Sequence, residues 1–456
     1  MHYLIAGSLI VLAGIPVMAD NPPIEPLPRT PIVEQAEPAV FVHVMTSFRT
    51  KEFSGTWRGW NQSNQHVQND PEQKDERGLP QIASVFHPAI GPYDQNDPHL
   101  VEYHCQLVKM AQLDGFFFDV GFFHGPQDEQ EEHWVANSMR EYIKAMQRYD
   151  LKGAIVYEEK YHWIFNPHIV EREEAVRRAK ADVDAWIDLF EPVQWYIGDR
   201  PLVTFFSFQH ILEDKGISRL TPEEMLAWRQ DMDPQPITMT QWLPPHYHEV
   251  HEGWKTWIQQ SRDVPEGSEL RAYADEDVLH ELLGDRYRDI RRRMNNGHID
   301  IAIPAVWPGF DDRRVHGWGQ GPRFTPHEDG KTYELTWNYA LASEMPVIQV
   351  ATWNDWFEGT IIEPSVENGT RYLNMTRHFA ARHKREAVND ANLELPVWIY
   401  RLRKRAKEDA EALAAADRSS ELIARSQFGE AETVVEPWVD RYALTGYDFE
   451  ASPDDK

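Results

Sequence analysis

The chain has 456 residues, a formal net charge of −28 at pH 7 and a hydrophobic fraction of 41%. A chain of this length can form one large α/β domain with an appendage. The negative charge repels nucleic acids and anionic lipid surfaces, so we expect neither as a partner.

The first residues predict an export signal. An apolar run from Leu4 to Val17 ends in Met18-Ala19 before Asp20, and about 14 apolar residues are too few for a membrane span. We therefore expect residues 1–19 to be a cleaved signal peptide and the protein to be secreted or periplasmic, without membrane insertion. Residues 20–38 contain six prolines and no periodic pattern, which predicts an extended linker.

The folded part is expected to begin with a strand at residues 39–45. The polar stretch 46–98 is too long for an ordinary turn, and such loops usually cover a site. From residue 99 onward, the hydrophobic pattern alternates between helix and strand. Helices are expected at 100–112, 134–150, 171–190, 221–231, 275–295 and 333–343, and further strands at 115–120, 153–157, 201–206, 237–242, 299–306 and 347–353.

These elements predict a (β/α)8 TIM barrel over residues 39–385. They provide seven strands, and we place an eighth near Arg271; the active site of such a barrel lies at the carboxyl ends of its strands. A doubly wound open sheet is the competing fold, but no strand is followed by a glycine-rich phosphate turn. Residues 386–456, with a nearly continuous helix-forming stretch from Leu395 to Arg425, predict a C-terminal helical extension.

Several predicted strands end in acidic or histidine side chains. A barrel brings such residues together at one face, and they are His43, Asp119, Glu158, Glu159, Asp311, Asp312, Asp355 and Glu358. Cleavage of a glycosidic bond needs one carboxyl group to protonate the departing oxygen and a second to assist at the anomeric carbon. Asp355 and Glu358 are the candidate pair. The alternative is that either acid caps the following turn or pairs with an arginine.

Aromatic and polar residues near these acids are candidate substrate contacts, because flat rings stack on sugars. Together with the strand-end residues above, they are Trp57, Trp307, Trp318, Trp353, Asn354 and Trp356. His246, His248 and His251 invite a metal interpretation, but they follow two prolines in a loop and lack the helical HExxH spacing. We therefore expect no metal and no cofactor.

The segment WNDWFEGTIIEP at residues 353–364 resembles the WNEWHEGTQIEP signature of family 99 glycoside hydrolases, the endo-α-mannosidase family, and of related WbsX-type proteins. Pro308–Arg313 is similar to the PG(Y/F)(N/D)D segment of that group, and Ile155–Glu158 to its strand-end acid. Val40–Met45 and the WND-x-x-E pattern ending at Glu358 are also similar to family 71, the α-1,3-glucanases. The likeness spans about Val40 to Leu373.

The resemblance implies a barrel enzyme that cleaves α-glycosidic bonds with retention. By position, Asp355 becomes the base that deprotonates the sugar 2-hydroxyl, and Glu358 the general acid/base. Asp355 is one methylene shorter than the family 99 Glu, and Phe357 replaces a His of that family. These two differences favour the chemistry of family 71 or a branch of the family with another substrate. We expect an exported, endo-acting hydrolase of an α-linked polysaccharide; the alternatives are a WbsX-like polysaccharide-biosynthesis enzyme and a non-catalytic glycan-binding barrel.

Overall fold

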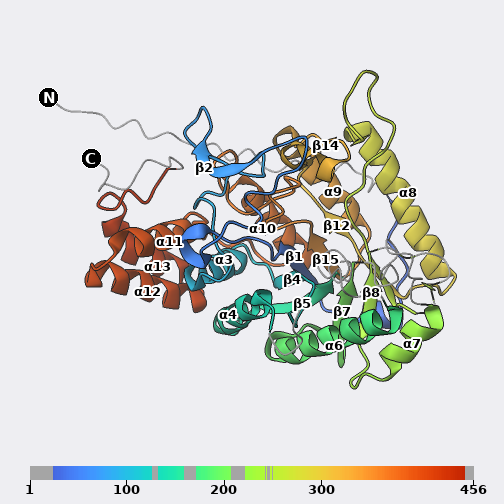
Figure 1. Ribbon diagram of the computed structural model, residues 1–456. Coiled ribbons are helices and arrows are strands. Elements are labelled where there is room, and N and C mark those ends of the chain that lie inside the picture. Colours follow the sequence, from blue (N-terminus) through green and yellow to red (C-terminus); the bar gives the residue numbers. More distant parts are fainter. Residues whose placement is uncertain are drawn as a thin grey trace.

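The computed structural model describes residues 24–125, 132–158, 171–206, 221–241, 243, 247–248 and 250–446. Its centre is a barrel of parallel strands surrounded by helices (Figure 1). The strands are β1 (Ala39–Met45), β4 (Gly115–Val120), β5 (Lys152–Tyr157), β7 (Arg200–Phe205), β8 (Ile237–Thr240), β9 (Gly253–Lys255), β11 (Ile301–Ile303), β12 (Ala305–Val306) and β15 (Val347–Val350).

The barrel closes through one strand that is interrupted at Pro304. Before the proline, β11 pairs with β9, and after it β12 pairs with β15, which pairs with β1. Proline has no N–H to donate to the sheet, so it marks the point where the strand changes partners. Counting β11 and β12 as one strand gives eight strands in chain order, which confirms the predicted (β/α)8 TIM barrel.

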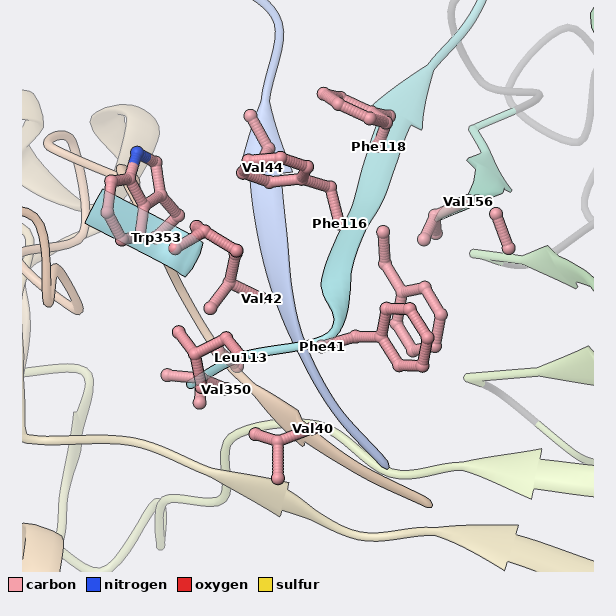
Figure 2. Packing of buried hydrophobic residues seen from close by; sticks show 14 of the residues in the cluster. Val40, Phe41, Val42, Val44, Leu113, Phe116, Phe118, Val156, Val350 and Trp353 are labelled. Carbon is pink, nitrogen blue, oxygen red and sulfur yellow. The ribbon is translucent and has the colours of Figure 1, made fainter. Parts of the chain in front are cut away.

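Strand β1 shows how the sequence fills both sides of the barrel wall. Successive side chains point to opposite faces. Phe41 stacks on Phe117 of β4, with ring centroids 4.6 Å apart, whereas Val42 lies on the opposite face near Val350 and Trp353 (Figure 2). His43 is two residues after Phe41 and therefore shares its face inside the barrel.

Six of the helices around the barrel agree with the expected ranges to within a few residues, whereas the seventh, α10 (Arg371–Lys384), was not predicted. One start is fixed by a capping box, in which the Thr221 hydroxyl accepts from the Glu224 N–H and the Glu224 carboxylate accepts from the Thr221 N–H. The helices are α3 (Pro98–Met110), α4 (Trp134–Tyr149), α6 (Arg172–Phe190), α7 (Pro222–Gln230), α8 (Glu276–Asn295), α9 (Lys331–Ala342) and α10 (Arg371–Lys384).

The eighth strand is not near Arg271, where we expected it, but is β9. Its three residues, Gly-Trp-Lys, are too few to show a period in the sequence. The residues after Arg271 instead form β10 (Ala272–Tyr273), which joins β14 (Arg323–Thr325) and β13 (Phe310–Asp311) in a separate three-stranded sheet. This small sheet carries several of the charged residues described below.

The conformation of residues 24–38 also differs from the extended linker that we expected. They pack on the barrel, with Leu27 and Val33 buried and the Leu27 N–H donating to Ser343 O. Thr30 caps the short helix α1 (Pro31–Gln35), and proline is well suited to the first helical position. Residues 1–23 lie outside the described residues, so the signal peptide stays a prediction.

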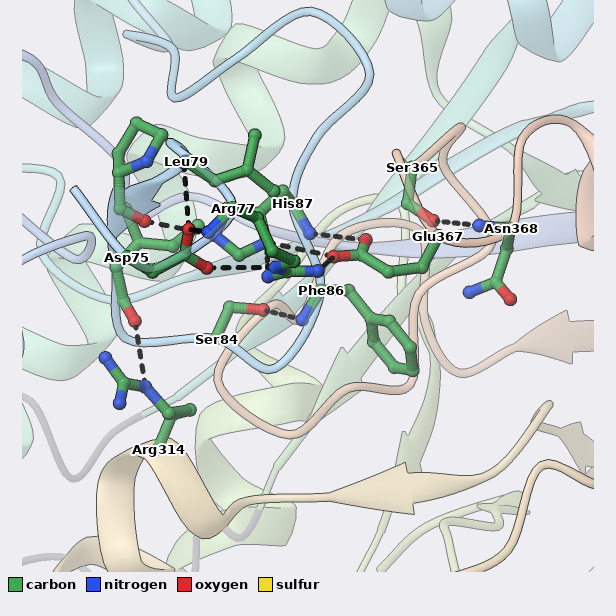
Figure 3. Close-up of polar contacts among 12 residues, drawn as sticks. Asp75, Arg77, Leu79, Ser84, Phe86, His87, Arg314, Ser365, Glu367 and Asn368 are labelled. Carbon is green, nitrogen blue, oxygen red and sulfur yellow. Dashed lines mark hydrogen bonds and ion pairs between the residues drawn. The ribbon is translucent and has the colours of Figure 1, made fainter. Parts of the chain in front are cut away.

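The long stretch 46–98 is folded over the barrel. It contains helix α2 (Lys51–Ser54) and the hairpin of β2 (Asp70–Lys74) with β3 (Pro80–Gln81). Arg77 and His87 each contact the Glu367 carboxylate at 3.0 Å (Figure 3). These contacts fix the hairpin to the chain segment that follows the 353–364 motif.

The C-terminal residues form a helical unit, as predicted, but not one continuous helix. It consists of α11 (Leu395–Ala406), α12 (Ala410–Ala424), α13 (Phe428–Val435) and a short turn at Glu436–Trp438. The unit packs against α3 and α4 at one side of the barrel (Figure 1). No helix in the described ranges is long and apolar enough to cross a membrane.

Candidate active site

The loop after β15 carries both candidate catalytic acids, Asp355 and Glu358, and we call it the acid loop. It closes where the Thr352 N–H donates to Thr360 O at 2.8 Å. Inside it, the Asp355 carboxylate accepts from the Glu358 N–H at 3.1 Å. Gly359 has φ of +63°, and a Cβ atom there would lie 3.2 Å from Asp311 O. A glycine after Glu358 therefore lets this loop pack closely against β13.

Glu358 forms an ion pair with Arg323 of β14. The guanidinium Nη2 lies 2.6 Å from Glu358 Oε1, and its Nε lies 2.7 Å from Asp312 Oδ2. Burial raises the pKa of Asp312 to about 6, although the charge of Arg323 acts in the opposite direction. No motif marks Arg323 in the sequence, so its role appears only when β14 is placed beside the loop.

Asp355 lies in a different electrostatic environment. Only 4% of its surface is exposed, and burial together with the charge of Glu358 raises its pKa well above that of an ordinary carboxyl group. The charge of Arg323 opposes this shift. Two neighbouring carboxyl groups in unequal environments are the arrangement on which glycoside hydrolysis depends. The structural roles weighed above are present too, because Asp355 caps the turn and Glu358 pairs with an arginine.

A second group of ionisable residues lies at the carboxyl ends of four strands. We call it the charged layer, and its members are His43, Asp119, Glu158 and Lys255. All four are buried. His43 Nε2 lies 3.4 Å from Asp119 Oδ2. The Trp353 N–H, at the start of the loop that carries the acid pair, donates to His43 O at 2.7 Å, so the charged layer and the acid pair lie at the same end of the barrel.

The sequence predicts three of the four members of the charged layer, because a strand-end acid or histidine is easy to recognise. Lys255 was missed together with its strand. Trp257, which follows it, was missed for the same reason, and its ring lies edge-on to that of His43 with centroids 4.7 Å apart. Glu159, which we also expected at this face, lies outside the described residues.

Four of the expected substrate contacts are buried inside the protein. The Asn354 side chain binds the backbone N–H of Met45 at 2.8 Å and the hydroxyl of Tyr93 at 3.1 Å, and Trp356 Nε1 donates to the same hydroxyl. Rings without exposed surface cannot stack on a sugar, so the three tryptophans among these four residues pack inside the protein, while hydrogen bonds hold the side chain of Asn354. The four residues are Trp307, Trp353, Asn354 and Trp356.

Trp318 is an exposed aromatic residue that contacts the acid loop. It is 46% exposed and lies 5.1 Å, centroid to centroid, from Phe357, which stacks in turn on Phe48. Trp57, by contrast, is half-buried and packs against the core. Asp311 pairs with Arg313 at 2.5 Å, and its N–H donates to Glu358 O, so it braces the loop.

The histidines after β8 do not gather around one point in the described part of the chain. His248 binds Arg293, while His251 Nδ1 lies 3.3 Å from the Thr238 hydroxyl. His246 lies outside the described residues. Within those residues there is no group of three or more His, Cys, Asp or Glu arranged to hold a metal ion.

Sequence comparisons connect this barrel with known enzymes. The model of glycosyl hydrolase family 99 matches residues 287–387, the segment that contains Asp311, Arg323, Asp355 and Glu358. A glycoprotein endo-alpha-1,2-mannosidase from Xenopus laevis is 20% identical over 344 residues, which are 67% of each chain. The protein of that name from Rattus norvegicus is 30% identical over 106 residues, covering 20% of this chain and 22% of the relative.

Comparisons of structure agree on the fold. The GH99 endo-alpha-mannosidase from Bacteroides thetaiotaomicron superposes with a TM-score of 0.54 at 15% identity, covering 76% of this chain and 98% of the other. A glycoside hydrolase-like protein superposes with a TM-score of 0.52 at 14% identity, over 80% and 97% of the two chains. Both superpositions support the same barrel architecture.

Proposed function

We propose that this family 99-like glycoside hydrolase is an exported, retaining enzyme that cleaves α-mannosidic bonds within a polysaccharide. The observation that carries the proposal is the pair Asp355 and Glu358 on one loop at the carboxyl end of β15, inside the segment that matches the family. The matched relatives named endo-alpha-1,2-mannosidase support the choice of an α-linked mannose. The apolar run Leu4–Val17 supports export.

In this proposal Glu358 is the general acid/base. It gives a proton to the glycosidic oxygen as the bond breaks, and later takes a proton from the attacking water. Asp355 assists on the other side of the anomeric carbon by accepting the proton of the sugar 2-hydroxyl, whose oxygen forms the transient bond to that carbon. Since burial favours the protonated form of Asp355, the positive charge of Arg323 supports this role by favouring the ionised form.

The surrounding residues have separate tasks in the same proposal. Three members of the charged layer, His43, Asp119 and Glu158, provide hydrogen-bonding groups for the hydroxyls of the sugar that is attacked. Trp318 provides an exposed ring for a neighbouring sugar. An endo-acting enzyme needs contacts on both sides of the cleaved bond. The folded stretch 46–98, through Phe48, and the small sheet of β10, β13 and β14, through Asp311, contact the loop of Glu358 and are the elements proposed to supply these contacts.

The test is turnover of a panel of α-linked polysaccharides by the purified protein and by its Glu358→Gln variant. We expect oligosaccharide products from an α-mannan with the wild-type protein, and a loss of about 10²- to 10⁴-fold in kcat for the variant. Glutamine keeps the size of the side chain, so thermal melting serves as the folding control. Binding of the glycan without turnover would contradict the proposal and favour a glycan-binding barrel, and undiminished turnover by the variant would refute the role of Glu358.

A further inference from the structure

Lys255 is a buried cation that the proposed bond cleavage does not use. It is fully buried at the end of β9, where its Nζ donates to Gln349 Oε1 at 3.2 Å and lies 5.1 Å from the ring centroid of Trp257. Gln349 is fixed by its own bond to Thr256 O at 2.6 Å. A buried ammonium group is costly unless carboxylates compensate its charge, so its neighbours indicate its purpose.

The compensating charges come from the charged layer. Asp119 of β4 and Glu158 after β5 favour the charged form of Lys255, and Lys255 in turn acts on His43 of β1. Strands β8, β11, β12 and β15 carry no ionisable side chain, and the one on β7, Arg200, is at its opposite end and pairs with Glu252. Within the described residues, the ionisation of Lys255 is therefore coupled to the charged layer.

Within the described part of the chain, His43 is a member of this layer with unused hydrogen-bonding capacity. The residue is fully buried, and its Nδ1 has no hydrogen-bond partner among the described residues. Burial and the charge of Lys255 lower its pKa, so the ring is neutral and offers one donor and one acceptor. Sugar hydroxyl groups both donate and accept hydrogen bonds, and they match such a layer of ring nitrogens and carboxylates.

We propose that Lys255 is a positioning residue of the sugar-binding subsite, whose ammonium group keeps Asp119 and Glu158 ionised and in place to accept hydrogen bonds from sugar hydroxyls. The proposal rests on the proposed glycosidase function and identifies the residue that organises its sugar contacts. Without the ammonium group, the buried layer would lose its compensating charge, and protonation of a carboxyl group in it would be favoured. One acceptor would then become a donor, and the hydroxyl pattern would no longer fit.

The charge of Lys255 gives this role a pH signature. Burial lowers the pKa of Lys255 to about 7, against the opposing charges of Asp119 and Glu158. The ammonium form is therefore lost as the pH rises through that value, and kcat/KM should fall with it. The same shift contributes stability as the pH rises from about 7 towards 10.5, because the unfolded chain binds more protons in that window. A loss of activity in this range would run opposite to the contribution of Lys255 to stability.

The test compares Lys255→Arg and Lys255→Met with Lys109→Met as the matched control. Lys109 is half-buried on the outer helix α3, burial also lowers its pKa, and its Nζ donates to Tyr149 O at 3.0 Å. We expect Lys255→Met to lower kcat/KM about 100-fold and the control to resemble the wild type. Lys255→Arg should retain activity above pH 7, because a guanidinium stays charged there. Circular dichroism verifies that each variant is folded.

A binding measurement separates this inference from the proposed function. Calorimetric titration of mannan oligosaccharides into the Glu358→Gln variant, with and without Lys255→Arg, is made at about pH 6 and about pH 8.5. Affinity that falls with pH only when Lys255 is present supports the inference even if the wild-type protein shows no turnover. Two results together would overturn the inference and leave the hydrolase function standing. The first is that the wild type and Lys255→Arg have the same pH profile of turnover, and the second is that Lys255→Met is fully active.

Discussion

At the scale of single residues, Asp355 and Asp114 have the same direction of pKa shift and lie at different positions in the barrel. Burial raises the pKa of both Asp355 and Asp114. Asp114 lies at the opposite end of the barrel, before β4, where its carboxylate accepts from the Val40 N–H at 2.7 Å and pairs with Lys384. Burial alone therefore does not mark a catalytic group, whereas the position beside Glu358 does.

The variant Asp355→Asn should lose about 10²- to 10⁴-fold in kcat with little change in KM. The amide oxygen can still accept from the Glu358 N–H, so the loop keeps its shape while the group can no longer exchange a proton. Steady-state kinetics on the α-mannan measure the effect, and Asp114→Asn is the control with the same chemical change at the far end of the barrel. Equal loss of kcat in both variants would mean that the effect of Asp355→Asn is structural.

Sequence reasoning predicted those residues of the candidate site that end a recognisable strand or belong to a motif. His43, Asp119, Glu158, Asp355 and Glu358 were predicted in this way. Lys255 and Arg323 were not predicted, because an isolated basic residue carries no pattern and its meaning depends on which acid the fold places beside it. The same reasoning misplaced Trp353 and Trp356, because a sequence does not show which face of a loop its aromatic rings occupy.

At the scale of elements, most long strands and helices were predicted well, whereas the helix α10 and the short strands were not. Strand β1 agrees with its predicted range, whereas β9 has only three residues and was missed. The proline-rich segment 24–38 was expected to be extended because prolines suggest a linker, yet Leu27 and Val33 anchor it on the barrel. The conformation of such a segment is decided by its packing, and this packing depends on surfaces formed by distant parts of the chain.

At this scale, we predict the effect of removing the exposed ring of Trp318. The exposed ring rests on Phe357, next to Glu358, so Trp318→Ala should raise KM for a polysaccharide about 3- to 10-fold and leave kcat nearly unchanged. Tyr196→Ala is the control, because Tyr196 is a similarly exposed ring on β6 (Tyr196–Ile197), which pairs with the start of β7 at the other end of the barrel. An unchanged KM in Trp318→Ala would remove Trp318 from the binding site.

At the scale of the whole molecule, the barrel and the C-terminal helices form one packed body. Arg403 of α11 binds the Glu102 carboxylate of α3, which also accepts from Arg148 at 2.6 Å. The helical unit thus packs on the outer side of the barrel (Figure 1). This architecture was predictable because a repeated alternation of strands and helices and a run of helix-forming residues are large-scale features. The register that brings β14 beside the acid loop was not, because it depends on pairing between residues far apart in the sequence.

The most direct test of the central claim is the anomeric form of the first product. Retention follows if Asp355 and Glu358 act in two successive displacements at the anomeric carbon. Time-resolved proton NMR of an α-mannan during hydrolysis by the wild-type protein should show the α-anomer of the new reducing end first, with the β-anomer appearing later by mutarotation. If the β-anomer appears first, the reaction inverts the configuration, and the roles assigned to Asp355 and Glu358 are wrong.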